Sequence, residues 1–169
     1  MAAINDLLVD SFTRVRDITY GVLDGLTDDE LTWRPGTHAN PIGWLLWHVS
    51  RTQDDHVSDV AGTQQRWHAD EWQQRFALPY TPTAIGYGHT SEQVAAFRAD
   101  AELLRGYHEA VFEATVSYVS GLGEDDFARV VDTRWDPPVT LAVRLVSVVN
   151  DNVQHIGQAA YLRGMLAER

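Results

Sequence analysis

Two segments of the sequence carry side chains that could bind one metal ion. His48 lies at the border of the apolar stripe of a helical segment that starts near Pro41, and Asp151 and His155 stand four residues apart near the C-terminus. Residues four apart lie on one face of a helix, so Asp151 and His155 can chelate a single ion. His48 is then the best donor of a third contact. Two imidazoles and one carboxylate leave positions open for water or substrate, as in catalytic zinc sites.

This spacing can also arise by chance. Given 24 acidic residues in 169, about one of the seven histidines would have an acid four positions earlier by chance. His48 and His155 could each be ordinary core or surface histidines. The metal hypothesis gains weight because both lie along apolar faces of long helices, where unpaired polar groups are costly. His56 cannot join the site, since eight residues along one helix separate it from His48 by about 12 Å.

Composition limits the chemistry that this chain can perform. All 13 basic residues are arginine, and the sequence contains neither lysine nor cysteine. This excludes lysine Schiff-base chemistry, a thiolate nucleophile of the protein's own and thiolate metal sites, so any metal must be held by imidazole and carboxylate. The net charge of -11 argues against nucleic acid as a partner. No apolar run approaches the length of a membrane span, and no signal peptide is evident, so we expect a cytoplasmic protein with no membrane partner.

The pattern of apolar residues predicts an all-α fold with one domain over residues 1–169. Helical spacing favours four long helices, with a long connection between the second and the third. Shorter helices are predicted at 27–31 and 67–76, a loop at 78–90, and a briefly extended stretch at 128–132. Asn40 is expected to cap the second helix, with Pro41 in its first turn. The four long helices are predicted at residues 5–25, 40–61, 91–121 and 139–166.

Such a bundle builds its sites from side chains that project inward from facing helices. We expect His155 within the apolar stripe of the last helix and Asp151 at its edge. Arg51 and Arg144 could meet an anionic substrate, or be solvated helix charges or ion-pair partners. Asp54 and Asp55, together with Arg51, are expected to form an exposed pattern of helix charges.

The residues around the candidate ligands resemble those of a known superfamily. Residues 40–49, followed by Gln-Asp-Asp-His at 53–56, resemble the metal-ligand helix of the DinB-like superfamily. Residues 151–158, with Tyr-Leu-Arg at 161–163, resemble its last-helix motif, in which a His-x-x-x-His pair usually precedes Gly-Gln. The resemblance implies a four-helix bundle, often a homodimer, with a divalent ion, commonly zinc or nickel, on three inward ligands. By position these ligands are His48, Asp151 and His155.

Asp151 departs from the usual motif, in which most members of the superfamily have histidine. In the branch of mycothiol-dependent maleylpyruvate isomerases the corresponding residue is the carboxylate of glutamate, which is one methylene longer. The resemblance therefore implies a small-molecule-thiol-dependent transferase or isomerase with a His-Asp-His site. The donor set suits zinc, and also nickel or Fe(II). Because the chain has no cysteine, the sulfur must arrive on a thiol such as mycothiol or bacillithiol.

Three classes of function remain open at this point. The first is a metal- and thiol-dependent transferase, isomerase or detoxification enzyme acting on a small-molecule substrate. The second is a non-catalytic ligand-binding or stress-response bundle, in which a metal organises the pocket without turnover. The third is a purely structural dimer with a vestigial site. No catalytic acid or base can be assigned from the residues alone.

Overall fold

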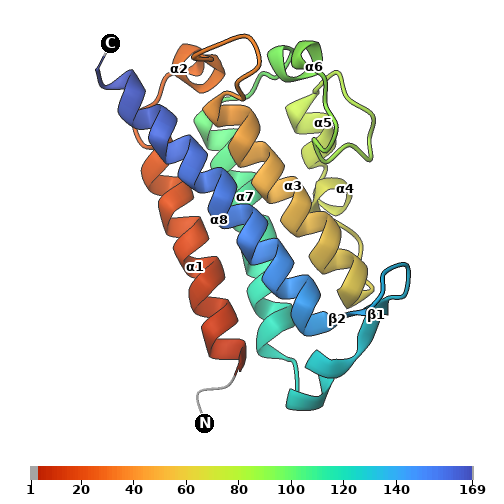
Figure 1. Cartoon of the computed structure of the whole chain (residues 1–169). Coiled ribbons are helices and arrows are strands. Elements are labelled where there is room, and N and C mark those ends of the chain that lie inside the picture. The colour runs from red at the N-terminus through yellow and green to blue at the C-terminus, as the bar shows by residue number, and fades with distance from the viewer. Residues whose placement is uncertain (1–3, 169) are drawn as a thin grey trace.

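Four long helices form the body of the computed structural model, which describes residues 4–168 (Figure 1). α3 packs against α8 and α7, and α1 packs against α7 and α8. The predicted all-α four-helix bundle is therefore confirmed. The long helices are α1 (Ile4–Leu23), α3 (Ile42–Ala61), α7 (Ala101–Ser120) and α8 (Leu141–Leu166).

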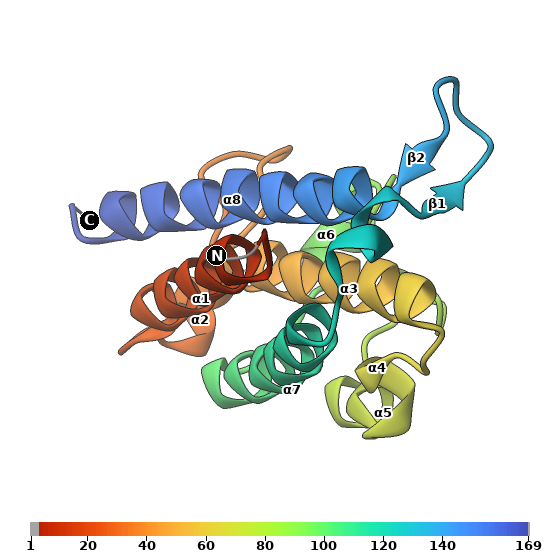
Figure 2. The ribbon, with the colours of Figure 1, turned by 90° about the horizontal axis from the view of Figure 1, so that it is seen from below.

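Shorter elements fill the connections between the long helices. The α3–α7 connection is long, as predicted, and contains three short helices that lie beside α3 and α7 (Figures 1 and 2). A two-stranded antiparallel hairpin precedes α8 and projects beyond its first turn (Figure 2). These elements are α2 (Asp28–Thr32), α4 (Arg66–Ala69), α5 (Trp72–Phe76), α6 (Ser91–Ala95), the 3-10 helix η1 (Glu124–Ala128), β1 (Val130–Asp132) and β2 (Val139–Thr140).

The helix ends show where the prediction was wrong. The third long helix begins at Ala101 rather than at 91, because Asp100 accepts a hydrogen bond from Leu103 N and starts a new helix, whereas α6 ends at Ala95. The single helix predicted at 67–76 is two helices, α4 and α5. Asn40 does not cap α3; Pro41 holds the cap position without a side-chain bond. The predicted end of α3 at Gly62 is confirmed, since this glycine adopts the left-handed conformation that closes a helix.

Aromatic side chains dominate the core on the α4–α5 side of the bundle. The ring of Tyr107 lies 5.1 Å from that of Trp67 and 5.7 Å from that of Trp72, and Phe76 contacts all three. Trp47 is fully buried between these rings and the α3–α7 connection. This aromatic cluster holds the connection against α3 and so brings the loop at 78–90 over the middle of that helix. Within residues 4–168, none of the helices combines the length and the apolar character that crossing a membrane needs.

Candidate metal centre

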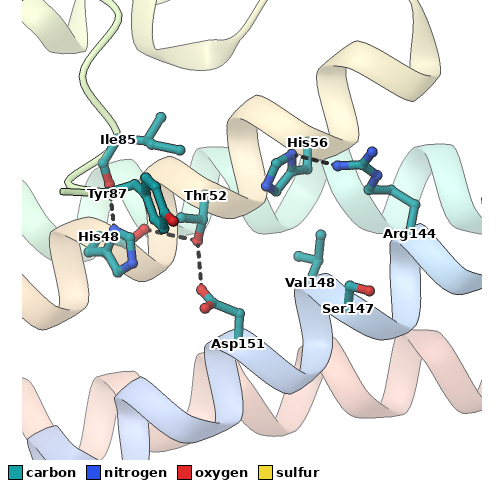
Figure 3. A pocket seen from close by; sticks show the side chains of 9 residues that line it. All are labelled: His48, Thr52, His56, Ile85, Tyr87, Arg144, Ser147, Val148 and Asp151. Atoms are coloured by element: carbon teal, nitrogen blue, oxygen red, sulfur yellow. Dashed lines mark hydrogen bonds between the residues drawn. The ribbon is translucent and has the colours of Figure 1, made fainter. Parts of the chain in front are cut away.

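The three predicted ligands meet between α3 and α8. His48 comes from α3, and Asp151 and His155 come from successive turns of α8; one nitrogen or oxygen atom of each lies within 4.8 Å of the others. The two imidazole rings are 4.8 Å apart, at 74° to one another. His56, which the sequence excludes from the site, contacts Arg144 instead (Figure 3).

His48 is held in one orientation by its surroundings. Its ring stacks on Trp44, with 5.0 Å between the ring centres, and its Nδ1 contacts the carbonyl oxygen of Ile85 (Figure 3). A carbonyl can only accept a hydrogen bond, so Nδ1 carries the proton and Nε2 keeps its lone pair for an ion. Burial lowers the pKa of His48 below its ordinary value, which keeps the imidazole neutral, as metal ligation requires.

Asp151 and His155 lie in contact on successive turns of α8. His155 Nε2 lies 3.5 Å from Asp151 Oδ1, and His155 Nδ1 is 3.0 Å from Gln158 Oε1. Thr52 Oγ1 donates to Asp151 Oδ2 at 3.3 Å. The hydrogen bond between the two groups lowers the pKa of Asp151 and raises the pKa of His155. A divalent cation would take the place of a proton on His155 Nε2 and bind both atoms.

The three side chains could close on a small divalent ion. Ligand atoms about 2 Å from a tetrahedral ion lie about 3.3 Å from one another. The separation of 3.5 Å between Asp151 Oδ1 and His155 Nε2 is close to this value. The Asp151 side chain is 41% exposed, and so has room to turn toward His48. The nitrogen and oxygen donors suit zinc, nickel or Fe(II).

A buried polar layer fixes the register of α8 against α3 beside this centre. Asn152 Nδ2 donates to Gln53 Oε1 at 2.7 Å, and Gln53 Nε2 donates to Thr115 Oγ1 of α7 at 2.9 Å. Asn152 follows Asp151 and Gln53 follows Thr52, so this layer also sets the contact between Thr52 and Asp151. The sequence places His155 within the apolar stripe, but Asn152 takes the fully buried position and His155 lies at the edge, 20% exposed.

A cavity of about 230 Å³ opens beside the candidate ligands. His48 and Asp151 lie at one end of it, and His56 and Arg144 lie at the other (Figure 3). The remaining lining residues come from α3, from the loop at 78–90 and from α8; they are Thr52, Ile85, Tyr87, Ser147 and Val148.

The two arginines considered from the sequence have different positions. Arg51 is completely buried and donates to Tyr107 Oη and to the carbonyl oxygen of Ala84, so it is an internal ion-pair partner rather than a contact for substrate. Arg144 lines the cavity and donates to Asp132 Oδ2 at 3.0 Å. Of the two, only Arg144 is placed to meet a ligand.

The loop at 78–90 contributes to the site in a way that sequence reasoning missed. Gly86 adopts φ +96°, and a Cβ there would lie 2.8 Å from His48 Nδ1 and 2.9 Å from Trp44 Cζ2. Glycine is therefore needed for the backbone of Ile85 to reach His48. The two glycines of this loop, Gly86 and Gly88, were the available signal, but nothing in the sequence shows which helix the loop covers.

We expect Gly86→Ala to lower metal affinity about 10- to 100-fold, which is the usual effect of losing a partner that orients a ligand. The new methyl group would push the loop away and separate Ile85 O from His48 Nδ1. Gly88→Ala is the matched control, since Gly88 has a similar φ of +74° but no atom within 4 Å of the added Cβ. Zinc titration of both variants measures the difference. Equal affinity in the two would contradict the role of the loop.

Comparison with known proteins finds similarity to a family model and to solved structures. Residues 7–168 match the family model described as mycothiol-S-transferase. A protein described as the conserved protein of locus from Enterococcus faecalis has a crystal structure that superposes with a TM-score of 0.93; the match has 30% identity and covers 100% of both chains. No curated protein matches the sequence.

Proposed function

The chain belongs to the mycothiol-S-transferase family, and we propose that it is a divalent-metal-dependent enzyme that joins the sulfur of an intact low-molecular-weight thiol to a small electrophile. The observation that carries this proposal is the meeting of His48, Asp151 and His155, the first two of which line a cavity. Mycothiol is the thiol that the family description names. Zinc is the ion that we expect, with nickel or Fe(II) as alternatives.

A divalent ion in this site would supply a Lewis acid that binds the thiol sulfur and lowers its pKa. The protein itself would hold three metal-binding atoms in place and leave the coordination positions that face the cavity free for the thiol. Ile85 orients His48, Gln158 orients His155, and Thr52 orients Asp151. In the reaction a carbon–sulfur bond forms, the electrophile's leaving group departs with its electron pair, and the thiol proton passes to solvent.

The absence of cysteine supports a reaction in which the thiol is a cosubstrate. The sequence has no cysteine, so no protein thiol can act as the nucleophile or compete for the ion. The reacting sulfur must then come from a cosubstrate. A homodimeric assembly and a cytoplasmic location stay predictions.

The test is thiol-dependent consumption of a model electrophile, such as monobromobimane, by protein purified without a histidine tag. A free thiol of pKa about 8.5 is only a few per cent ionised at pH 7, so full ionisation would raise the rate up to about 30-fold. We expect the zinc-loaded protein with mycothiol to react at least about tenfold faster than the metal-free protein, and a chelator to abolish the gain. Bacillithiol and glutathione serve as comparison thiols. No gain over metal-free protein with any thiol would favour the non-catalytic binding bundle.

A further inference from the structure

A second cavity, of about 480 Å³, adjoins the first at the hairpin end of α3. The two cavities share His56 and Arg144, which lie in contact at their junction (Figure 3). The second cavity lies between the C-terminal half of α3, the start of α8 and the β1–β2 hairpin. Its other lining residues are Asp55, Asp59, Val131, Asp132, Thr133 and Arg134.

Together the two cavities make an extended path that starts at the candidate metal centre. His48 borders the first cavity and Asp59 borders the second, and eleven residues of α3 separate them, which is about 16 Å along the helix. A compact electrophile would not need this length. An elongated molecule with its reactive atom at one end would occupy both cavities.

The lining of the second cavity suits a hydroxyl-rich ligand without charge. Asp132 accepts from both Arg134, at 2.8 Å, and Arg144, at 3.0 Å, so these two cations already share one carboxylate. Asp55 and Asp59 add two further carboxylates, which makes the net charge of the lining about -1 with neutral histidine. Such a surface accepts hydrogen bonds from hydroxyl groups and repels an anionic ligand.

Donor groups in the lining complete the set. A guanidinium can only donate, so the contact between Arg144 Nη1 and His56 Nδ1 leaves the proton of His56 on Nε2, free to donate. Burial lowers the pKa of His56 below its ordinary value, which keeps it neutral. Arg134, whose side chain is 83% exposed, adds guanidinium donors to the lining of the second cavity. Donors and acceptors are thus both present, as the recognition of a polyol requires.

We propose that the second cavity binds the uncharged, hydroxyl-rich body of the thiol cosubstrate, with the sulfur directed along the first cavity toward His48. This inference rests on the proposed function, which it deepens by assigning the body of the thiol to the hairpin side of the site. The cavity then selects a thiol whose body is a neutral polyol over thiols whose bodies carry carboxylates.

The test uses a probe that has no sulfur. N-Acetylglucosaminyl-inositol, the body of mycothiol without its cysteine, is titrated into zinc-loaded, ¹⁵N-labelled full-length protein and followed by amide chemical shifts. We expect shifts at the end of α3 and in the hairpin. Asp59→Asn should weaken binding about tenfold, because a charge-assisted hydrogen bond becomes a neutral one. Thr133→Trp should block binding by filling the cavity.

Both changes alter exposed side chains, so the fold should persist. Asp17→Asn, on the exposed face of α1, is the matched control and should bind as the wild type does. Glucosaminyl-malate, an anionic body of similar size, should bind more weakly than the neutral probe. The inference is overturned if the shifts instead surround a separate cavity that Ala39, Leu45 and Tyr161 line, if both variants bind normally, or if the anionic probe binds equally well.

These outcomes separate the inference from the proposed function. If the sulfur-free probe binds at the hairpin but no thiol is consumed, the cavity assignment holds and the transferase proposal fails. If mycothiol is consumed and both variants keep the wild-type KM for it, the transferase proposal holds and the cavity assignment fails. If both are correct, Asp59→Asn raises the KM for mycothiol and leaves the KM for the electrophile unchanged.

Discussion

His155→Ala should bind a divalent ion more than about a hundredfold less tightly than the wild type, since even the loss of a group that only orients a ligand costs 10- to 100-fold. The variant keeps His48 and Asp151, but two donors from different helices lack the chelating pair on α8. Thiol consumption should fall to the level of the metal-free protein. Metal analysis of the untagged protein, together with zinc titration, measures the first effect.

Loss of the ion must be distinguished from loss of the fold in this variant. The His155 side chain is 20% exposed and contacts the side chains of Asp151, Gln158 and His48, so its removal should change the circular dichroism spectrum little. His38→Ala, in an exposed loop, is the control for removing any one histidine and should keep the full metal content. If His155→Ala also keeps its full metal content, the assigned ligand set is wrong.

The candidate metal centre could be predicted from the sequence because helix geometry is local. Four residues along α8 bring Asp151 and His155 together whatever the rest of the chain does. His48 on α3 can then be predicted as the third ligand, because both helices face the same core. Ile85, which orients His48, could not be predicted, because the path of the loop at 78–90 depends on the aromatic cluster beneath it.

The fold, like the site, was predicted where the local sequence pattern determines the structure and missed where it does not. The periodic segments predicted four long helices, and all four are present. The break between α6 and α7 was missed, although Asp100 is a typical capping residue, because apolar residues continue at helical spacing from Val94 to Leu104. The Asp100 cap nevertheless starts a new helix, and Phe97, which lies in the break, is fully buried.

The charges on α3 show where the prediction was wrong. Arg51, Asp54 and Asp55 were expected to form an exposed pattern, but Arg51 and Asp54 are buried at 0% and 2% exposure. Sequence spacing cannot reveal this, because the partners that make burial possible come from α7 and from the start of α4. Tyr107 donates to Asp54 Oδ2 at 2.8 Å and accepts from Arg51 Nη1 at 3.1 Å. Charged residues are buried only when they are paired in this way.

Asp54 also binds the start of α4, and so links α3 to the α3–α7 connection. Its carboxylate accepts from the backbone N–H groups of Arg66, at 2.9 Å, and Trp67, at 2.8 Å. These are the first N–H groups of α4, whose own cap residue, Gln65, makes no side-chain cap bond. A carboxylate from α3 therefore caps α4 from a distance of 12 residues in sequence, and so holds the connection that carries Ile85.

We expect Asp54→Asn to lower the free energy of unfolding by about 3–5 kcal/mol, the typical effect of breaking a buried ion pair on one side. The amide would place a donor against the N–H groups of α4 and leave Arg51 buried without a counter-charge. Asp55→Asn is the matched control on the next residue; its side chain is 35% exposed, and we expect a change of about 1 kcal/mol or less. Urea denaturation followed by tryptophan fluorescence gives both values. Equal effects at the two positions would show that burial of Arg51 and Asp54 does not stabilise the fold. Asp54→Asn should also weaken zinc binding, because the loop that orients His48 depends on the same carboxylate.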